Sequence, residues 1–231
     1  MKIACWSGPR NLSTAMMYSF ANRADFHPMD EPFYAAFLRE TGIDHPMAAE
    51  VMAAHETDWT QAAAACTQDG IPHVYQKHMC HHILPQTPLD WAKECKHIFL
   101  IRHPARVLAS YQAKRQSVKL ADIGAEQQLD LFDAFGGIVI DSADIRADPD
   151  TMLRALCGAL ELDFDPAMLA WPAGGHAADG VWARHWYGAV HQSTGFSGPE
   201  GPLPDLSGPL ADLCEEAMPG YSILRTQKLT A

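Results

Sequence analysis

Residues 3–14 read Ile3-Ala4-Cys5-Trp6-Ser7-Gly8-Pro9-Arg10-Asn11-Leu12-Ser13-Thr14, an apolar run followed by turn-forming and polar residues. This order predicts a short strand, a tight Gly-Pro turn and the first turn of a helix. Such a loop directs several backbone N–H groups to one point, and the positive end of the helix dipole lies beside them. Hydroxyl groups and one guanidinium group stand in the same loop, so residues 8–14 are expected to bind an anion.

The kind of anion follows from what this loop lacks. A nucleotide triphosphatase loop ends in Gly-Lys-Ser/Thr, because its lysine contacts the outer phosphates and its hydroxyl holds magnesium. Here Leu12 precedes Ser13, and Arg10 is the only basic residue of the loop. We therefore expect a phosphate-like ligand rather than metal-assisted use of ATP. The residues expected to bind it are Gly8, Pro9, Arg10, Asn11, Leu12, Ser13 and Thr14.

A second anion site is predicted further along the chain. The apolar segment His97–Ile101 ends in Arg102, and Pro104 then suits the first position of a helix, where its missing N–H costs nothing. Ser110 lies nearly two turns along that helix. Arg102 and Ser110 can therefore meet one second anion.

With these two motifs the chain resembles the sulfotransferases that use 3′-phosphoadenosine 5′-phosphosulfate (PAPS). In that family a loop of the Arg/Lys-Ser-Gly-Thr-Thr type binds the 5′-phosphosulfate, and a later Arg, with a Ser eight residues on, binds the 3′-phosphate. Arg10 with Ser13-Thr14, and Arg102 with Ser110, match both motifs in order and spacing. The sequence departs from the family pattern at Asn11-Leu12, where Ser-Gly is usual.

The resemblance covers most of the chain and implies further roles. Glu31 lies 21 residues after Arg10, the offset of the proposed catalytic base in tyrosylprotein and related Golgi-type sulfotransferases. Lys77, at the end of the strand-like Val74–Lys77, is similar to the family lysine that contacts the bridging oxygen of the leaving phosphate. Trp182 and Arg184 stand in a segment similar to the family's late Gly-x-Trp segment, which closes over the nucleotide.

The chemistry of sulfuryl transfer asks for these residue types. An acceptor hydroxyl loses a proton as it attacks sulfur, so a partly buried carboxylate such as Glu31 can act as general base. Arg10, Lys77 and the loop amides can stabilise the negative charge that develops. The cluster at residues 77–82 carries several histidines, and His78 is an alternative base. A metal site there is disfavoured because no carboxylate lies close by in sequence.

Composition limits the size, location and partners that this chain is expected to have. The 231 residues are 48% hydrophobic, enough for one compact domain over residues 1–231, and the six cysteines show no close paired spacing, which indicates reduced core thiols. No signal segment or membrane-spanning run is found, so a cytoplasmic location is expected. The net charge of −11 argues against nucleic acid as a partner and favours a small, neutral or cationic acceptor.

Strand-like and helix-like segments alternate along the chain. They predict an α/β fold of three layers, with a mostly parallel central sheet and helices on both faces, similar to the P-loop nucleoside-kinase-like fold of sulfotransferases. Arg10, Glu31, Lys77 and Arg102 fall at or beyond strand ends, so we expect them on one rim of the sheet. Residues 33–70 are interpreted as a helical cap on the acceptor side, and 196–209 as a Pro/Gly-rich mobile surface loop. A final helix is expected near residues 210–218.

These observations favour a sulfotransferase that moves a sulfuryl group from PAPS to a hydroxyl or amine of a small molecule. Adenosine 3′,5′-bisphosphate would be the product, and no metal ion or membrane would take part. Two alternatives remain. The strand Gly137–Asp141 resembles the magnesium-binding strand of ATPases and admits a P-loop kinase that uses ATP. The third possibility is a non-catalytic protein that binds phosphonucleotides.

Overall fold

The central sheet of the computed structural model is five-stranded, with the order β2-β3-β1-β4-β5 and every neighbouring pair parallel. The structure describes residues 1–67, 70, 73–113 and 118–231. The strands are β1 (Lys2–Ser7), β2 (His27–Asp30), β3 (Val74–Met79), β4 (Lys96–Ile101) and β5 (Ile138–Asp141). The predicted α/β fold with a parallel sheet is therefore confirmed.

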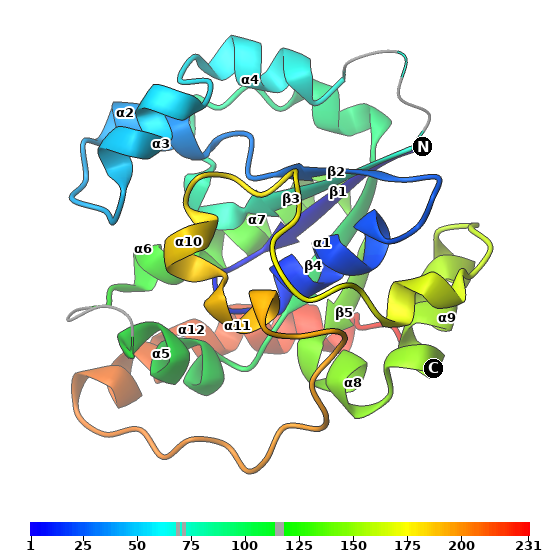
Figure 1. Cartoon of the computed structure of the whole chain (residues 1–231). Coiled ribbons are helices and arrows are strands. Elements are labelled where there is room, and N and C mark those ends of the chain that lie inside the picture. Colours follow the sequence, from blue (N-terminus) through cyan, green and yellow to red (C-terminus); the bar gives the residue numbers. More distant parts are fainter. Residues whose placement is uncertain (68–69, 71–72, 114–117) are drawn as a thin grey trace.

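Helices surround this sheet on both sides (Figure 1). The α-helices are α1 (Ser13–Ala21), α2 (Tyr34–Thr41), α3 (Ala48–Ala54), α4 (Trp59–Ala65), α5 (Pro104–Gln112), α6 (Leu120–Ile123), α7 (Ala125–Phe135), α8 (Ser142–Ala147), α9 (Pro149–Ala159), α10 (Ala183–Trp186), α11 (Gly188–His191) and α12 (Pro209–Thr226). The 3₁₀ turns are η1 (Cys80–His82), η2 (Asp90–Glu94) and η3 (Pro166–Leu169). None of the helices in the described ranges is both long and apolar enough to cross a membrane.

The three layers follow from the alternation of side chains along the strands. Ile3 and Cys5 of β1 pack on one face of the sheet with α1, α8 and α9. Ala4 and Trp6 point to the other face, where they join α4, α7 and α12. Figure 1 shows α1 in front of the sheet and α7 and α12 behind it. Both faces are thus covered, which is why these strands read as nearly continuous apolar runs.

The loops that carry the predicted site residues leave the sheet at one rim. Ser7, at the end of β1, is paired with Met79 at the end of β3 and with Leu100 near the end of β4. Asp30, the last residue of β2, is paired with Lys77. Because the strands are parallel, their carboxyl ends and the loops after them converge.

The segment from residue 33 to residue 70 divides into two parts. Helices α2 and α3 form an apolar cluster with α10 at the carboxyl rim, around Tyr34, Leu38 and Trp182. Helix α4 instead packs on the face of the sheet through Ala62 and Ala63. Residues 68 and 69 of this segment lie outside the described residues. Only the α2–α3 part therefore stands over the carboxyl rim.

The C-terminal helix is longer than the sequence predicted. It runs from Pro209 to Thr226 and contains Pro219, where a helix near residues 210–218 was expected to end. Ala217 and Leu224 on either side of the proline are buried against α5 and the sheet, and this packing outweighs the local cost of Pro219. Beyond the helix, Leu229 N–H donates to Val139 O at 2.7 Å, alongside β5.

Helix α9 begins at a side-chain cap and buries one face. The Asp148 carboxylate accepts a hydrogen bond from Thr151 N–H at 3.1 Å, and Leu153, Leu156 and Cys157 are fully buried. All six cysteines are unpaired, and four of them are buried.

Leu153→Ala should lower the free energy of unfolding by about 2–5 kcal/mol, because it opens a cavity in the layer between α9 and the sheet. Leu203→Ala, in an exposed loop, is the matched control and should change it by less than about 0.5 kcal/mol. Urea unfolding followed by circular dichroism measures both values. Equal losses in the two variants would contradict this view of the core.

Candidate functional site

A cavity of about 250 Å³ opens at the carboxyl rim of the sheet. The loop after β1 forms its floor, and residues following β2, β3, β4 and β5 contribute to its walls. Of the predicted catalytic residues, Arg10, Glu31 and Lys77 line this cavity. Of the predicted donor-binding residues, those that line it are Pro9, Arg10, Asn11, Leu12, Ser13, Thr14 and Arg102.

The loop at residues 8–14 holds an unusual backbone shape. Arg10 and Leu12 have φ values of 63° and 69°, in the left-handed region that residues other than glycine rarely adopt. The Asn11 amide donates to Leu100 O at 3.2 Å and fixes the loop to the end of β4. Leu12 is the N-cap of α1 and offers no side-chain hydrogen bond, so the first N–H groups of the helix are open to a ligand.

Two guanidinium groups lie close together beside this loop. Arg10 Nε donates to Ser110 Oγ at 2.9 Å, and Arg102 Nη1 donates to the carbonyl oxygen of Arg10 at 2.6 Å. Burial and the nearby positive charge of Arg102 lower the pKa of Arg10. Ser110, predicted to act with Arg102, thus contacts Arg10. The arrangement gathers positive charge at one end of the cavity, where an anion can compensate it.

A carboxylate that the sequence did not single out meets these arginines. Glu200 Oε1 accepts from Arg102 Nη2 at 2.5 Å and from Arg146 Nη1 at 3.1 Å, and Oε2 lies 2.7 Å from Arg106 Nε. The Glu200 side chain is 4% exposed, although it belongs to the loop expected to be a mobile surface segment. In the sequence, Glu200 stands out only as a single charged residue between two Gly-Pro pairs, at residues 198–202.

A second charged cluster occupies the other end of the cavity. Lys77 Nζ forms ion pairs with Glu31 Oε1 and, at 3.0 Å, with Asp30 Oδ1. All three side chains are nearly inaccessible to solvent, at 1%, 8% and 1% exposure for Lys77, Glu31 and Asp30. Glu31 has a φ of 43°, so its backbone is strained where its carboxylate enters the cavity. Asp30 was not predicted, although it precedes Glu31 at the strand end.

Tyr187 joins the two carboxylates to the rim. Its hydroxyl lies 2.9 Å from both oxygens of Asp30 and 3.2 Å from Glu31 Oε1. It accepts hydrogen bonds from Lys77 Nζ at 2.7 Å and from Trp182 Nε1 at 2.9 Å. Tyr187 lines the cavity and Trp182 lies behind it. The network therefore fixes the ammonium and both carboxylates through direct side-chain hydrogen bonds.

One ammonium cannot neutralise two buried carboxylates. Burial raises the pKa of Glu31, and the Asp30 carboxylate adds to this effect against the opposing attraction of Lys77. Burial by itself lowers the pKa of Lys77, but the two carboxylates outweigh it and raise that pKa. Lys77 is thus a stable cation, and the raised pKa of Glu31 suits this carboxylate to accept a proton.

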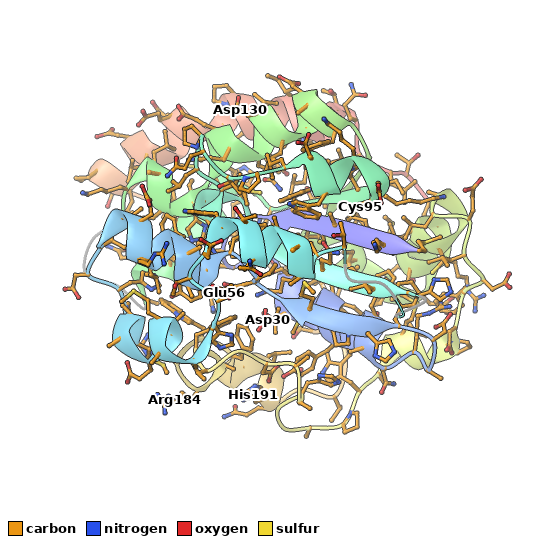
Figure 2. The ribbon with its side chains drawn as sticks, turned by 90° about the horizontal axis from the view of Figure 1, so that it is seen from above. Asp30, Glu56, Cys95, Asp130, Arg184 and His191 are labelled. Atoms are coloured by element: carbon orange, nitrogen blue, oxygen red, sulfur yellow. The ribbon has the colours of Figure 1, made fainter. Side chains whose placement is uncertain are left out.

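Besides Ser110, four predicted site residues do not line the cavity. Gly8 packs against the Ile123 carbonyl oxygen, which a Cβ would approach to 2.5 Å. Trp182 is buried behind Tyr187, and Arg184 is 64% exposed and paired with Glu50. Figure 2 shows Arg184 at the outer edge and Asp30 inside the fold. The segment containing Trp182 supports the site through its backbone, because Gly180 N–H donates to Asp30 Oδ2 at 3.1 Å.

His78 is the fourth of these residues. Successive side chains of a strand point to opposite faces, so Lys77 enters the cavity while His78 stacks on Trp6 at 4.6 Å. Burial lowers the pKa of His78 to about 3. The imidazole next to the base is instead that of His82, whose Nδ1 lies 3.8 Å from Glu31 Oε2. Burial also lowers the pKa of His82 well below its ordinary value, so it is neutral at pH 7.

The residues proposed for a magnesium-dependent kinase are engaged elsewhere. Asp141 caps α8 by accepting from Ala143 N–H at 2.9 Å, and it accepts from the Tyr221 hydroxyl at 2.9 Å. It does not line the cavity. Across the described ranges, no group of three or more His, Cys, Asp or Glu side chains has a metal-binding arrangement.

The fold and cavity agree with comparison to known proteins. The family model described as "Sulfotransferase domain" matches residues 1–228. This chain belongs to the sulfotransferase domain family, as its sequence motifs predicted.

Relatives and solved structures extend this finding. Two Arabidopsis thaliana proteins, named branched-chain-amino-acid aminotransferase-like protein 2 and protein 1, are 36% and 37% identical over 232 and 235 residues. The matches cover 96% and 97% of this chain but 41% of each relative, so the chain spans about two fifths of their length.

Solved structures with the same fold are sulfotransferases. The sulfotransferase domain of the curacin biosynthetic pathway has a TM-score of 0.57 and 18% identity, over 96% of this chain and 97% of that one. The sulfotransferase domain of the Synechococcus PCC 7002 olefin synthase has a TM-score of 0.53 and 18% identity, over 93% of each chain. A sulfotransferase from Alicyclobacillus acidocaldarius has a TM-score of 0.55 and 12% identity, over 98% and 94%. At these identities the likeness concerns the fold alone.

Lys77→Met should lower the free energy of unfolding by about 3–5 kcal/mol, because it leaves two buried carboxylates without a counter-ion. Burial already raises the folded-state pKa of Glu31, and the variant loses the opposing attraction of Lys77. The loss should therefore shrink as the pH falls from about 7 toward about 5, where Glu31 binds a proton. Urea titrations at several pH values measure the effect.

Lys93→Met is the control for this variant, because the Lys93 side chain is 70% exposed. It should change stability by less than about 0.5 kcal/mol at every pH. A Lys77→Met loss that grows at lower pH would contradict the proposed charge balance.

Proposed function

We propose that this protein transfers the sulfuryl group of PAPS to a hydroxyl or amine of a small-molecule acceptor. The observation that carries the proposal is one cavity with two charged ends: a cluster of arginines at one end and a buried, basic carboxylate paired with a lysine at the other. Membership of the sulfotransferase domain family supports it. PAPS supplies the activated sulfuryl group and a leaving phosphate.

The residues present suit such a donor. The open N–H groups at the start of α1, with Arg10, Ser13 and Thr14, can hold the phosphosulfate end. Arg102 and Ser110 are proposed to hold the 3′-phosphate. A carboxylate oxygen already accepts hydrogen bonds from Arg102, which is consistent with an oxyanion at this position.

Glu31 is proposed as the general base. As the acceptor oxygen forms its bond to sulfur, the bond from sulfur to the bridging oxygen breaks, and the acceptor proton passes to a Glu31 carboxylate oxygen. Lys77 and Arg10 are cations at the cavity wall and can stabilise the charge left on the departing phosphate. Asp30 and Tyr187 hold Lys77 in place, so the ammonium needs no reorganisation during the reaction.

The acceptor end of the cavity has aromatic and imidazole walls. Tyr34 and Trp186 line it, and Tyr34 stacks on His82 with ring centroids 4.4 Å apart. Such walls suit a compact acceptor without negative charge, because an anion would meet Glu31. We propose that α2 and α3, within the segment 33–70, shape this end of a single domain. The cytoplasmic location and the absence of a nucleic-acid partner stay predictions.

Glu31→Gln should lower kcat for sulfuryl transfer by about 100-fold or more, because the amide cannot accept the acceptor proton. Donor affinity should stay within about threefold of wild type, since Glu31 lies at the opposite end from the arginines. Glu40→Gln, which removes an exposed carboxylate from α2, is the charge-matched control and should retain full activity. Turnover of PAPS with a panel of small phenols, alcohols and amines provides the assay.

In the wild-type protein, kcat/KM should rise with pH through a midpoint above the ordinary range of a carboxyl group, because burial raises the pKa of Glu31. Full activity of Glu31→Gln would exclude Glu31 as the base. Donor binding without turnover by the wild-type protein, over the whole panel, would favour the non-catalytic alternative.

Arg102→Ala should weaken binding of adenosine 3′,5′-bisphosphate by about 10-fold or more, because a charge-assisted hydrogen bond is lost. Wild-type binding should not need magnesium. Arg154→Ala, which removes an exposed guanidinium of α9, is the matched control. Calorimetry with the bisphosphate and with ATP, each with and without magnesium, measures these affinities. A preference for ATP with magnesium would favour the kinase alternative.

A further inference from the structure

The burial of Glu200 is unusual for its surroundings. Residues 197–199 and 201–203 are exposed, yet the Glu200 side chain between them is turned inward and almost fully buried. In Figure 1 the segment between α11 and α12 crosses from the side of α8 to the side of α5. Arg146 comes from α8 and Arg106 from α5, so Glu200 bridges these two helices below the cavity.

The charges at this point do not balance. Arg102, Arg106 and Arg146 contribute three positive charges, and Glu200 contributes one negative charge. Oε1 is shared between Arg102 and Arg146, while Oε2 lies near Arg106 Nε without an aligned hydrogen bond. A phosphate monoester carries a charge of about −1.5 to −2 at pH 7 and has three strong acceptor oxygens. It matches three guanidinium groups better than a carboxylate does.

A separate observation at the same wall points to a missing acceptor or donor. The Ser142 side chain is fully buried, and its hydroxyl has no hydrogen-bond partner among the described residues. Ser142 lines the cavity together with Arg102, Arg146 and Glu200. Buried hydroxyl groups are almost always hydrogen-bonded, so an unpaired one beside an arginine cluster indicates a ligand.

We propose that Arg102, Arg106, Arg146 and Ser142 form a binding site for a phosphate monoester dianion, which Glu200 fills in the free protein and vacates when the ligand binds. The site rests on the proposed function in one respect: its natural occupant would be the 3′-phosphate of the donor. It assigns ligand roles to Arg106, Arg146 and Ser142, and the role of an internal competitor to Glu200.

The same arginines hold the backbone around Glu200. Arg146 Nε donates to Gly198 O at 3.0 Å, and Arg106 donates to Gly201 O. A ligand that recruits these guanidinium groups therefore releases residues 197–202 as well as the carboxylate. Because Glu200 is part of the chain, its local concentration is high. The apparent affinity for the ligand equals the intrinsic affinity multiplied by the fraction of molecules in which Glu200 is released.

The test measures phosphate binding to Glu200→Gln and to Asp205→Asn by calorimetry. Asp205 is an exposed acid in the same loop, so its substitution changes the net charge equally and leaves the arginines untouched. Inorganic phosphate is the first probe, since it needs no nucleotide site. We expect Glu200→Gln to bind it about tenfold or more tightly than wild type does, Asp205→Asn to match wild type, and Arg146→Gln in the Glu200→Gln background to cancel the gain.

Binding affinities for adenosine 3′,5′-bisphosphate and adenosine 5′-monophosphate distinguish a failure of this site from a failure of the proposed function. Glu200→Gln should tighten the bisphosphate by a similar factor and leave the monophosphate unchanged. A gain for inorganic phosphate without any bisphosphate binding would remove the donor assignment and keep the site. An equal gain for the monophosphate, itself a phosphate monoester, would remove the assignment to the 3′-phosphate and keep the site. Tight bisphosphate binding, with no gain from Glu200→Gln for the bisphosphate or for inorganic phosphate, would overturn the site.

A measurement on the wild-type protein makes the result independent of how the variants fold. Saturating inorganic phosphate should speed limited proteolysis within residues 197–202, because the carboxylate and the arginine contacts to Gly198 O and Gly201 O are released. Unchanged or slower cleavage in this segment, with phosphate bound, would overturn the role of Glu200.

Discussion

The ammonium of Lys77, buried between Asp30 and Glu31, is the interaction on which the carboxyl rim depends. It connects the ends of β2 and β3, and through Tyr187 it also fixes the segment that carries Trp182. Burying one cation with two anions costs solvation energy that the hydrogen bonds around it must offset. The rim is therefore organised around an excess of negative charge, and Glu31, whose pKa is raised by burial, faces the cavity.

Local sequence order predicted the parts of the fold whose causes are local. The apolar run before Gly8 and the position of Pro104 each act within a few residues. The convergence of Arg10, Glu31, Lys77 and Arg102 was also predictable, because parallel strands end at one rim. The extent of α12 was not, since tertiary packing on either side of Pro219 determines it.

Some predicted site residues lie away from the cavity, where side-chain direction or distant contacts decide the arrangement. Strand alternation alone could have shown that His78 points away from Lys77. Trp182 and Arg184 were expected over the nucleotide, but the backbone of their segment supports Asp30 instead. Glu200 meets Arg102 across 98 positions of the chain, and no local pattern encodes such a contact. The sequence only weakly indicates Arg146 as a site residue, through its position four residues after Ser142 at the end of a strand.

Arg102 has a consequence for selectivity that goes beyond charge. One guanidinium group holds both the backbone of the loop at Arg10 and the carboxylate of Glu200. Both ends of a doubly anionic ligand would therefore lie near the Arg102 side chain. Binding of one end would change the hydrogen bonds that Arg102 can make to the other end. Such a site would bind tightly only a ligand that carries both anionic groups. Under the proposed function, a nucleotide with a single anionic end would gain only part of these contacts and would bind more weakly without any steric barrier.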